Sequence, residues 1–425
     1  MQAQIMNPVK KIFKKKSTKL AISISLGCLF SIVLFFLIIP KIYGLKYVAV
    51  KPIATPTTPV IIPDSLISNT LDANIVVTHL ATPKPVKAIY MTSWVAGDLS
   101  FKNKLIKSID DTELNSVIVD VKDTTGKISF AVNDPNLKKI NSAENRIKDV
   151  RSFIDQLHKK NIYVIGRIAV FQDPFWAKKF PSDAVKTLSN KSALWQDNKC
   201  KRAIRRGHEK DCTYWIDSGS KDYWNYIAEV GDEAYALGFD ELNFDYIRFP
   251  ADGNMKDIYF PVSEGKVKSD VMTSFTKFLH DHFAGVNDEK TPRPKISADI
   301  FGLVTTEIDD LGIGQLLIPY ATNFDYIMPM VYPSHFAPDT YGYKNPAIKP
   351  YEVVNFAIKK AVLRLKNANL DPYKLRPWLQ DFNLGAIYTP EMVRDQIKAT
   401  YDAGLDSWAL WDPANTYTTN ALLSS

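Results

Sequence analysis

The sequence predicts an α/β protein whose main part is a (β/α)8 TIM barrel, preceded by an N-terminal transmembrane helix and a Pro/Thr-rich linker. From Val86 onward, eight short runs of β-branched and apolar residues alternate with amphipathic stretches, as parallel strands alternate with crossover helices. Gly238 and Gly404 each stand where such a helix would end before the next strand. A doubly wound open sheet is the alternative, but no Gly-x-Gly-x-x-Gly or Gly-x-x-x-x-Gly-Lys motif follows any run.

The net charge of +7 belongs to the N-terminal segment. Nine of the 53 Lys and Arg residues lie in residues 1–51, which hold no acid, so the remaining chain carries 44 basic and 46 acidic residues. Phosphate binding needs a basic face, which a nearly neutral folded part lacks on average. We therefore expect no nucleic-acid partner.

The first 85 residues predict an anchor and a spacer. Residues 1–19 form a basic tail, and the uncharged run 20–39 is long enough, at about 1.5 Å per residue, to cross a bilayer core of about 30 Å. This run exceeds a signal-peptide core of about 7–15 residues, and no small-x-small cleavage site follows it, so an uncleaved signal anchor is favoured over a cleaved signal peptide. The basic flank should stay in the cytoplasm, which predicts a single-pass protein of the cell membrane with its remainder outside. Residues 40–85, rich in Pro and Thr, predict an extended extracytoplasmic linker.

The barrel domain is expected over residues 86–425. Its strands are expected at 86–93, 116–123, 163–171, 241–250, 295–303, 324–333, 376–382 and 406–413. Helices are expected at 147–160, 221–237, 271–283, 350–367 and 390–403. The extra length lies in long loops after the third and fourth strands.

Cys200 and Cys212 are the two cysteines of the predicted exterior, and such a pair in an oxidising compartment predicts a disulfide bond. A zinc site with His208 is the alternative, but it lacks a fourth ligand. The loop between the cysteines is basic, which is compatible with an anionic substrate or with a solvated lid.

Polar residues gather at the C-terminal ends of the predicted strands. Because all βα loops of a barrel leave from that end, these residues should surround one site. The candidate substrate-binding residues are Asp120, Asp123, Arg248, Tyr332, Gln380, Trp411 and Asp412. Two further carboxylates, Asp245 and Asp299, end neighbouring strands and are the candidate catalytic residues, since glycoside hydrolases use a carboxylate pair about 5–10 Å apart.

Strand alternation turns Asn243, Asp245 and Ile247 towards the same face, where an interior carboxylate is costly unless it is paired or functional. Arg248 or Arg167 could neutralise it. The sequence holds no Gly-x-Ser-x-Gly elbow and no His-Glu-x-x-His motif. It predicts no cofactor and no metal.

Several motifs, in order, resemble the bacterial "putative glycosyl hydrolase domain" family of barrel proteins over residues 86–417. The motifs lie at 119–126, 215–217, 238–250, 297–302, 328–335, 377–382 and 408–413. The family is distantly similar to the α-amylase-like glycoside hydrolases, and this resemblance implies that Asp245 is the nucleophile and Asp299 the acid/base. Amylase-like enzymes carry a Glu on the fifth strand and an Arg two residues before the nucleophile, where this chain has Asp299 and Asn243. The shorter acid leaves both retention and inversion open.

These observations predict a hydrolase that cleaves a cell-envelope or extracellular polysaccharide. A non-catalytic glycan-binding barrel at the cell surface is the alternative from another class, and replacing Asp245 by Asn distinguishes the two. A metal-dependent deacetylase is disfavoured because only six His are present.

Overall fold

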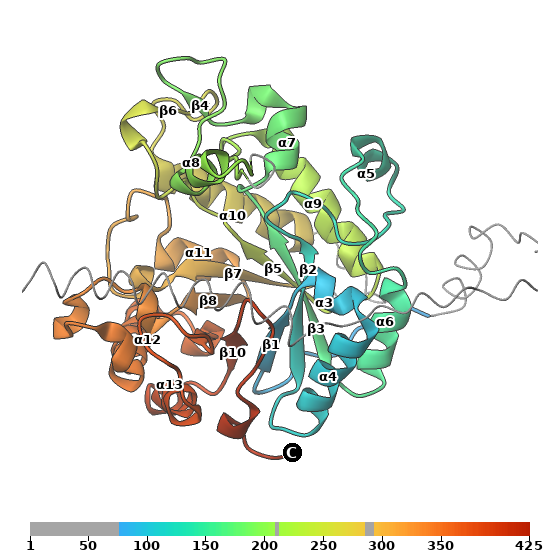
Figure 1. The fold of residues 1–425 in the computed structure, drawn as a ribbon, viewed down its shortest axis with the longest axis vertical. Coiled ribbons are helices and arrows are strands. Elements are labelled where there is room, and N and C mark those ends of the chain that lie inside the picture. The colour runs from blue at the N-terminus through green and yellow to red at the C-terminus, as the bar shows by residue number, and fades with distance from the viewer. Residues whose placement is uncertain (1–75, 209–211, 285–292) are drawn as a thin grey trace, which may run out of the picture. The chain divides into compact units, whose positions relative to one another are not determined.

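The computed structural model describes residues 76–208, 212–284 and 293–425. Eight parallel strands form a closed barrel in the order β1-β10-β9-β8-β7-β5-β3-β2 (Figure 1). The barrel strands are β1 (Lys87–Met91), β2 (Ser116–Lys122), β3 (Tyr163–Ala169), β5 (Glu241–Asp245), β7 (Lys295–Phe301), β8 (Tyr326–Met330), β9 (Trp378–Gln380) and β10 (Trp408–Trp411). The predicted TIM-like barrel and its eight strands are confirmed.

Helices connect the strands and pack around the barrel. They are α3 (Ser93–Gly97), α4 (Leu99–Asp110), α5 (Pro135–Ile140), α6 (Val150–His158), α7 (Pro174–Lys179), α8 (Asn198–Arg205), α9 (Lys221–Ala236), α10 (Lys268–Ala284), α11 (Leu317–Asn323), α12 (Pro350–Asn367) and α13 (Pro390–Asp402). Their ends follow the expected capping rules. The Ser220 hydroxyl accepts a hydrogen bond from the Tyr223 amide at the start of α9, and Gly238 and Gly404 take the positive φ angles of 113° and 89° that follow α9 and α13.

The loops after β3 and β5 are the long ones, as predicted. They contribute the two-stranded antiparallel sheet of β4 (Lys186–Thr187) and β6 (Ile258–Tyr259). The predicted disulfide joins Cys200 in α8 to Cys212. The bond therefore links the two ends of the basic segment between these cysteines.

Several predicted strands extend beyond the observed ones, and the overrun at a C-terminal end is greatest at β5. The sequence predicts a strand over 241–250, but β5 ends at Asp245 because Tyr246 takes a left-handed backbone conformation with φ 55°. Ile247 does not continue the alternation of Asn243 and Asp245, and its side chain packs in the cluster between sheet and helices. This turn brings Arg248 to the rim of the barrel.

Residues 76–85, predicted as part of the linker, pack against the N-terminal ends of the strands. The Leu80 amide donates to the buried Asp240 carboxylate at 2.6 Å, and the Thr82 hydroxyl lies 3.1 Å from that of Tyr163 at the start of β3. Beneath the barrel interior, Arg376 and Glu241 form an ion pair of 2.9 Å. Residues 76–85 and this ion pair therefore occupy the end of the barrel opposite the C-terminal ends of the strands.

The predicted membrane span, residues 20–39, lies outside the described residues. Within 76–208, 212–284 and 293–425, we find no helix with the length and apolar character needed to cross a bilayer.

Candidate active site

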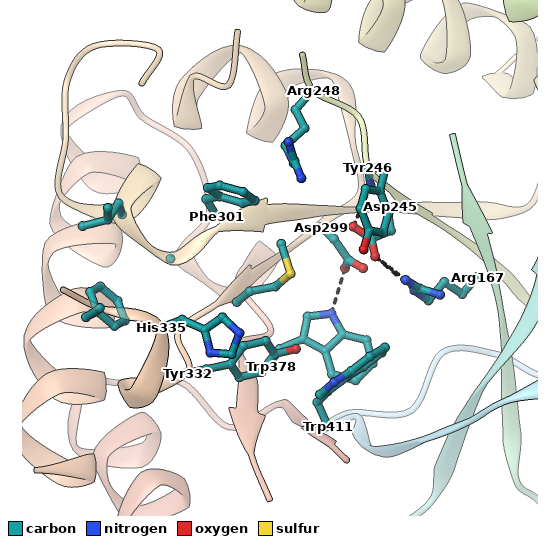
Figure 2. A pocket seen from close by; sticks show the side chains of 14 residues that line it. Arg167, Asp245, Tyr246, Arg248, Asp299, Phe301, Tyr332, His335, Trp378 and Trp411 are labelled. Atoms are coloured by element: carbon teal, nitrogen blue, oxygen red, sulfur yellow. Dashed lines mark hydrogen bonds and ion pairs between the residues drawn. The ribbon is translucent and has the colours of Figure 1, made fainter. Parts of the chain in front are cut away.

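Two carboxylates lie side by side at the C-terminal end of the barrel. The register of β5 and β7 pairs Phe244 with Ala298, so Asp245 and Asp299 are the next neighbours across the two strands. Strand alternation directs both side chains inward, and Figure 2 shows them facing the same cavity. The sequence-predicted pair is therefore brought together.

This cavity is a pocket of about 360 Å³ at the mouth of the barrel. It is lined by Arg167, Asp245, Tyr246, Arg248, Asp299, Phe301, Gly302, Leu303, Met330, Tyr332, His335, Phe336, Trp378 and Trp411. Most of the lining is aromatic or aliphatic, and Figure 2 shows Arg167, Asp245 and Asp299 together on one side of the pocket. Such a pocket, apolar with a few convergent polar groups, is typical of a ligand site.

Asp245 is paired with a cation. Arg167, in β3, approaches the Asp245 Oδ2 atom with its Nη2 at 2.5 Å and its Nε at 3.2 Å. The same guanidinium binds Asp120 Oδ1 at 2.7 Å, and Tyr90 donates its hydroxyl to Asp120 Oδ2 at 2.6 Å. An adjacent guanidinium stabilises the ionised form of a carboxylate. Arg167 thus holds two buried carboxylates together, one of which faces the pocket.

Asp299 has a different environment. Its Oδ1 accepts hydrogen bonds from Trp378 Nε1 at 2.8 Å and from Asn243 Nδ2 at 3.0 Å. Burial, together with the negative charge of Asp245, raises the pKa of Asp299 to about 8, against the opposing effects of Arg167 and the two hydrogen bonds. The raised pKa favours the protonated form of Asp299 near neutral pH. Since both donors bind Oδ1, Oδ2 is the atom that can carry the proton towards a ligand.

Flat aromatic faces border the carboxylates. Trp411 stacks on Tyr90 with ring centroids 4.1 Å apart and meets Trp378 edge-on at 5.5 Å. Across the pocket, Tyr332 packs edge-on against His335, whose pKa is lowered by burial. Sugar rings carry apolar CH faces that pack on such aromatic surfaces. The arrangement can therefore hold a sugar next to one carboxyl group that is paired with Arg167 and one whose pKa is raised.

The family described as "Putative glycosyl hydrolase domain" matches residues 88–417. The chain belongs to this family. The match covers the whole barrel, including both strands that carry the carboxylate pair. No curated protein sequence matches the chain.

Several solved structures are similar to this glycosyl hydrolase domain. A hypothetical protein from Ruminiclostridium thermocellum is 31% identical, over 50% of this chain and 96% of its own, with a TM-score of 0.40. An α-galactosidase from Thermus thermophilus is 11% identical, over 82% of this chain and 62% of its own, with a TM-score of 0.45. A GH18 chitinase from Cycas revoluta is 9% identical, over 79% of this chain and 96% of its own, also with a TM-score of 0.45.

Within the glycosyl hydrolase domain, the predicted substrate-binding residues fall into two groups. Arg248, Tyr332 and Trp411 line the pocket. Asp120 lies behind it, bound to Arg167. The geometry therefore places three of these side chains where they can touch a ligand and one where it acts through Arg167.

The other three predicted residues make local contacts away from the pocket wall. Asp123 pairs with Arg146 at 2.6 Å. Gln380 is fully buried and accepts from the Ser334 amide at 3.1 Å. Asp412 accepts backbone hydrogen bonds from the turn that follows β10. Asp123 and Asp412 turn towards the loops that leave their own strand ends, whereas Gln380 turns towards the loop that follows the neighbouring strand β8.

Several residues of this pocket were not predicted from the sequence. Asn243 and Trp378 bind Asp299 directly, and Phe301, Met330 and Phe336 form part of the wall. The inward alternation of Asn243 with Asp245 was a usable signal. The remaining residues sit in short strands or loops, where the pattern does not say which way a side chain points. Within 76–208, 212–284 and 293–425, no group of three His, Cys, Asp or Glu residues is placed to hold a metal ion.

Proposed function

We propose that this protein is a glycoside hydrolase that cleaves a cell-envelope or extracellular polysaccharide. The carrying observation is the difference between two neighbouring carboxyl groups: Asp245 is paired with Arg167, while burial and the charge of Asp245 raise the pKa of Asp299 to about 8. Glycoside hydrolysis needs one carboxylic acid and one carboxylate beside the scissile bond. The family membership supports the same reaction class.

In the proposed reaction, Asp299 donates its proton to the glycosidic oxygen as the bond breaks. Asp245 then either attacks the sugar carbon or activates a water, and its charge stabilises the oxocarbenium-like transition state. Arg167 keeps Asp245 in place, and Trp378 and Asn243 fix the orientation of Asp299. The ring faces of Trp411 and Tyr332 position the sugar.

The pH dependence of hydrolysis tests the role of Asp299. An acid with a pKa of about 8 loses its proton above that pH, so kcat/KM should fall on the alkaline side with a midpoint near 8. Trp378→Phe removes a hydrogen bond that favours the ionised form, so the pKa of Asp299 should rise and the alkaline midpoint should move to higher pH.

Trp408→Phe is the matched control. Trp408 is also a fully buried tryptophan of a barrel strand, but its indole donates to Tyr401, so the alkaline midpoint should stay in place. A midpoint that is unchanged in Trp378→Phe, or moved equally by both variants, would refute Asp299 as the acid.

We also propose that the barrel lies outside the cytoplasm and is held at the membrane by residues 20–39. The uncharged run and its basic flank support this placement, as does the Cys200–Cys212 disulfide, since such bonds persist in oxidising compartments. Protease added to intact cells should degrade the barrel while a cytosolic marker survives. Degradation only after lysis would contradict the proposal.

A further inference from the structure

Arg248, which is half-buried, differs from three arginines whose side chains are almost fully buried. Arg146, Arg167 and Arg376 each have a carboxylate oxygen at 2.5–2.9 Å. For Arg248, no carboxylate among the described residues lies within 4 Å of the guanidinium nitrogens. Its Nη1 donates to the Phe249 carbonyl at 3.0 Å. The remaining N–H groups are available to the pocket that Arg248 lines.

Aromatic rings hold this guanidinium in place. Its central carbon lies 4.7 Å from the centroid of the Trp215 ring and 4.6 Å from that of Phe301. A guanidinium between two rings keeps its charge and its planar array of donors. Figure 2 shows the side chain reaching down into the pocket from the rim, with Phe301 on one side and Asp245 on the other.

A chain of contacts links the Trp215 ring, which packs on Arg248, to the disulfide bond. The Trp215 indole donates to Asp197 Oδ2 at 3.4 Å, and Asp197 Oδ1 accepts from the Cys200 amide at 2.7 Å as the N-cap of α8. Cys200 is in turn bonded to Cys212. The insertion after β3 therefore builds one of the two rings that hold Arg248.

The protein only partly compensates the charge of Arg248. Burial lowers the pKa of its guanidinium, and the charges of Asp245, Asp252 and Asp197 oppose this effect from beyond ion-pair distance. A buried cation without a close partner is costly. An anion bound in the pocket would supply that partner.

The geometry points to Arg248 as the residue that recognises a carboxylate on the substrate, so that the polysaccharide is an acidic one containing uronic acid units. This inference rests on the proposed function, because it assumes that the pocket binds a sugar. A carboxylate matches the planar donors of a guanidinium in a bidentate pair. The pocket brings this cation to the same cavity as the catalytic carboxyl groups, so the acidic unit would occupy or adjoin the cleavage position.

Arg248 has one competing role, which is to stabilise the ionised form of Asp245 through space. The two roles differ in what they predict for neutral glycans. If Arg248 only stabilised ionised Asp245, it would increase the hydrolysis rate of every substrate. The affinity for a glycan would then not depend on the charge of that glycan. Recognition of a carboxylate would change binding of acidic glycans alone.

Binding to matched pairs of glycans tests the inference. Polygalacturonate, hyaluronan and alginate would each be compared with its carboxyl-reduced form, using calorimetry on the full chain. At least one acid should bind about 10- to 100-fold more tightly than its reduced form, the size expected of a charged hydrogen-bonded pair. Arg248→Met should abolish this preference, and Arg248→Lys, which keeps the charge but not the planar fork, should retain part of it.

Lys366→Met is the control, because Lys366 is an exposed cation in the last turn of α12, outside the pocket, and its loss should leave the preference intact. The inference fails if no acid is preferred by the wild type, or if Arg248→Met keeps the preference. Binding of dextran sulfate is compared with that of dextran to test a different anion. If the protein prefers only the sulfated glycan, the carboxylate assignment is wrong.

Turnover of the same glycans separates this inference from the proposed function. An acidic glycan that is bound through Arg248 but never cleaved would refute the hydrolase and keep the inference. Cleavage of a neutral glycan, with no preference for acidic glycans in binding, would support the hydrolase and refute the role of Arg248 in recognising a carboxylate.

Discussion

Asp245→Asn is expected to lower the rate of glycan hydrolysis by at least about 10⁴-fold, the size seen when a principal catalytic group is removed. Asparagine has nearly the same shape, so the pocket and its aromatic walls should persist. It cannot attack the sugar carbon or activate a water as a carboxylate does, and it carries no charge to stabilise an oxocarbenium-like centre. Glycan binding should therefore stay within a few-fold of the wild-type value. Both are measured on one preparation, by release of reducing ends and by calorimetry.

Asp381→Asn is the matched control for this change. Asp381 directly follows β9 and binds Thr418, outside the pocket, so its variant should hydrolyse glycans at nearly the wild-type rate. Undiminished hydrolysis by Asp245→Asn would exclude Asp245 as a catalytic group. If the wild type binds a glycan but never cleaves it, the protein is instead a glycan-binding barrel.

Arg167→Met is expected to lower the free energy of unfolding at pH 7 by about 3–5 kcal/mol, as when one partner of a buried ion pair is removed. Arg167 is the cation shared by Asp120 and Asp245, and all three side chains are buried. Methionine fills a similar volume but leaves two carboxylates without their partner. Urea unfolding measures the loss.

The loss should also depend on pH. Burial raises the pKa of Asp120, and the charge of Arg167 opposes this effect. Without Arg167 the pKa of Asp120 rises further, so the carboxyl group takes up a proton more readily as the pH falls. A protonated carboxyl group needs no cation, so the difference between variant and wild type should shrink from pH 7 to pH 5. Arg167→Lys should restore part of the stability, and the exposed Arg205→Met should change it by less than about 0.5 kcal/mol. An Arg167→Met loss that is equal at both pH values would contradict the ion-pair explanation.

The sequence was sufficient for the architecture because its signals are local. Short runs of β-branched or other apolar residues mark all eight strands, and Gly238 and Gly404 mark two helix ends through backbone conformations that glycine adopts easily. The error at the end of β5 has the opposite origin. Tyr246 carries no such local mark, and only the surrounding structure selects its positive φ angle.

The sequence predicts the parts of the candidate site that follow from the order of the strands. It does not predict the contacts between side chains that reach across the barrel. Asp245 and Asp299 lie at the ends of consecutive barrel strands, so their proximity follows from the fold. Trp378 reaches Asp299 from β9, which is separated from β7 by β8. That contact depends on the size and direction of side chains inside the barrel, which spacing along the sequence does not encode. The same limit applies to Gln380, which is a strand-end residue but turns towards Ser334 and away from the pocket.

The position of residues 76–85 at the N-terminal ends of the strands affects how a long glycan could reach the pocket. The chain arrives at the strand ends opposite the pocket, where the Leu80 amide binds Asp240. Residues 76–85 and the mouth of the pocket therefore lie at opposite ends of the barrel strands. In the proposed hydrolase, residues 76–85 would therefore not obstruct a long glycan that lies across the mouth, which is compatible with cleavage within a glycan chain as well as at its end.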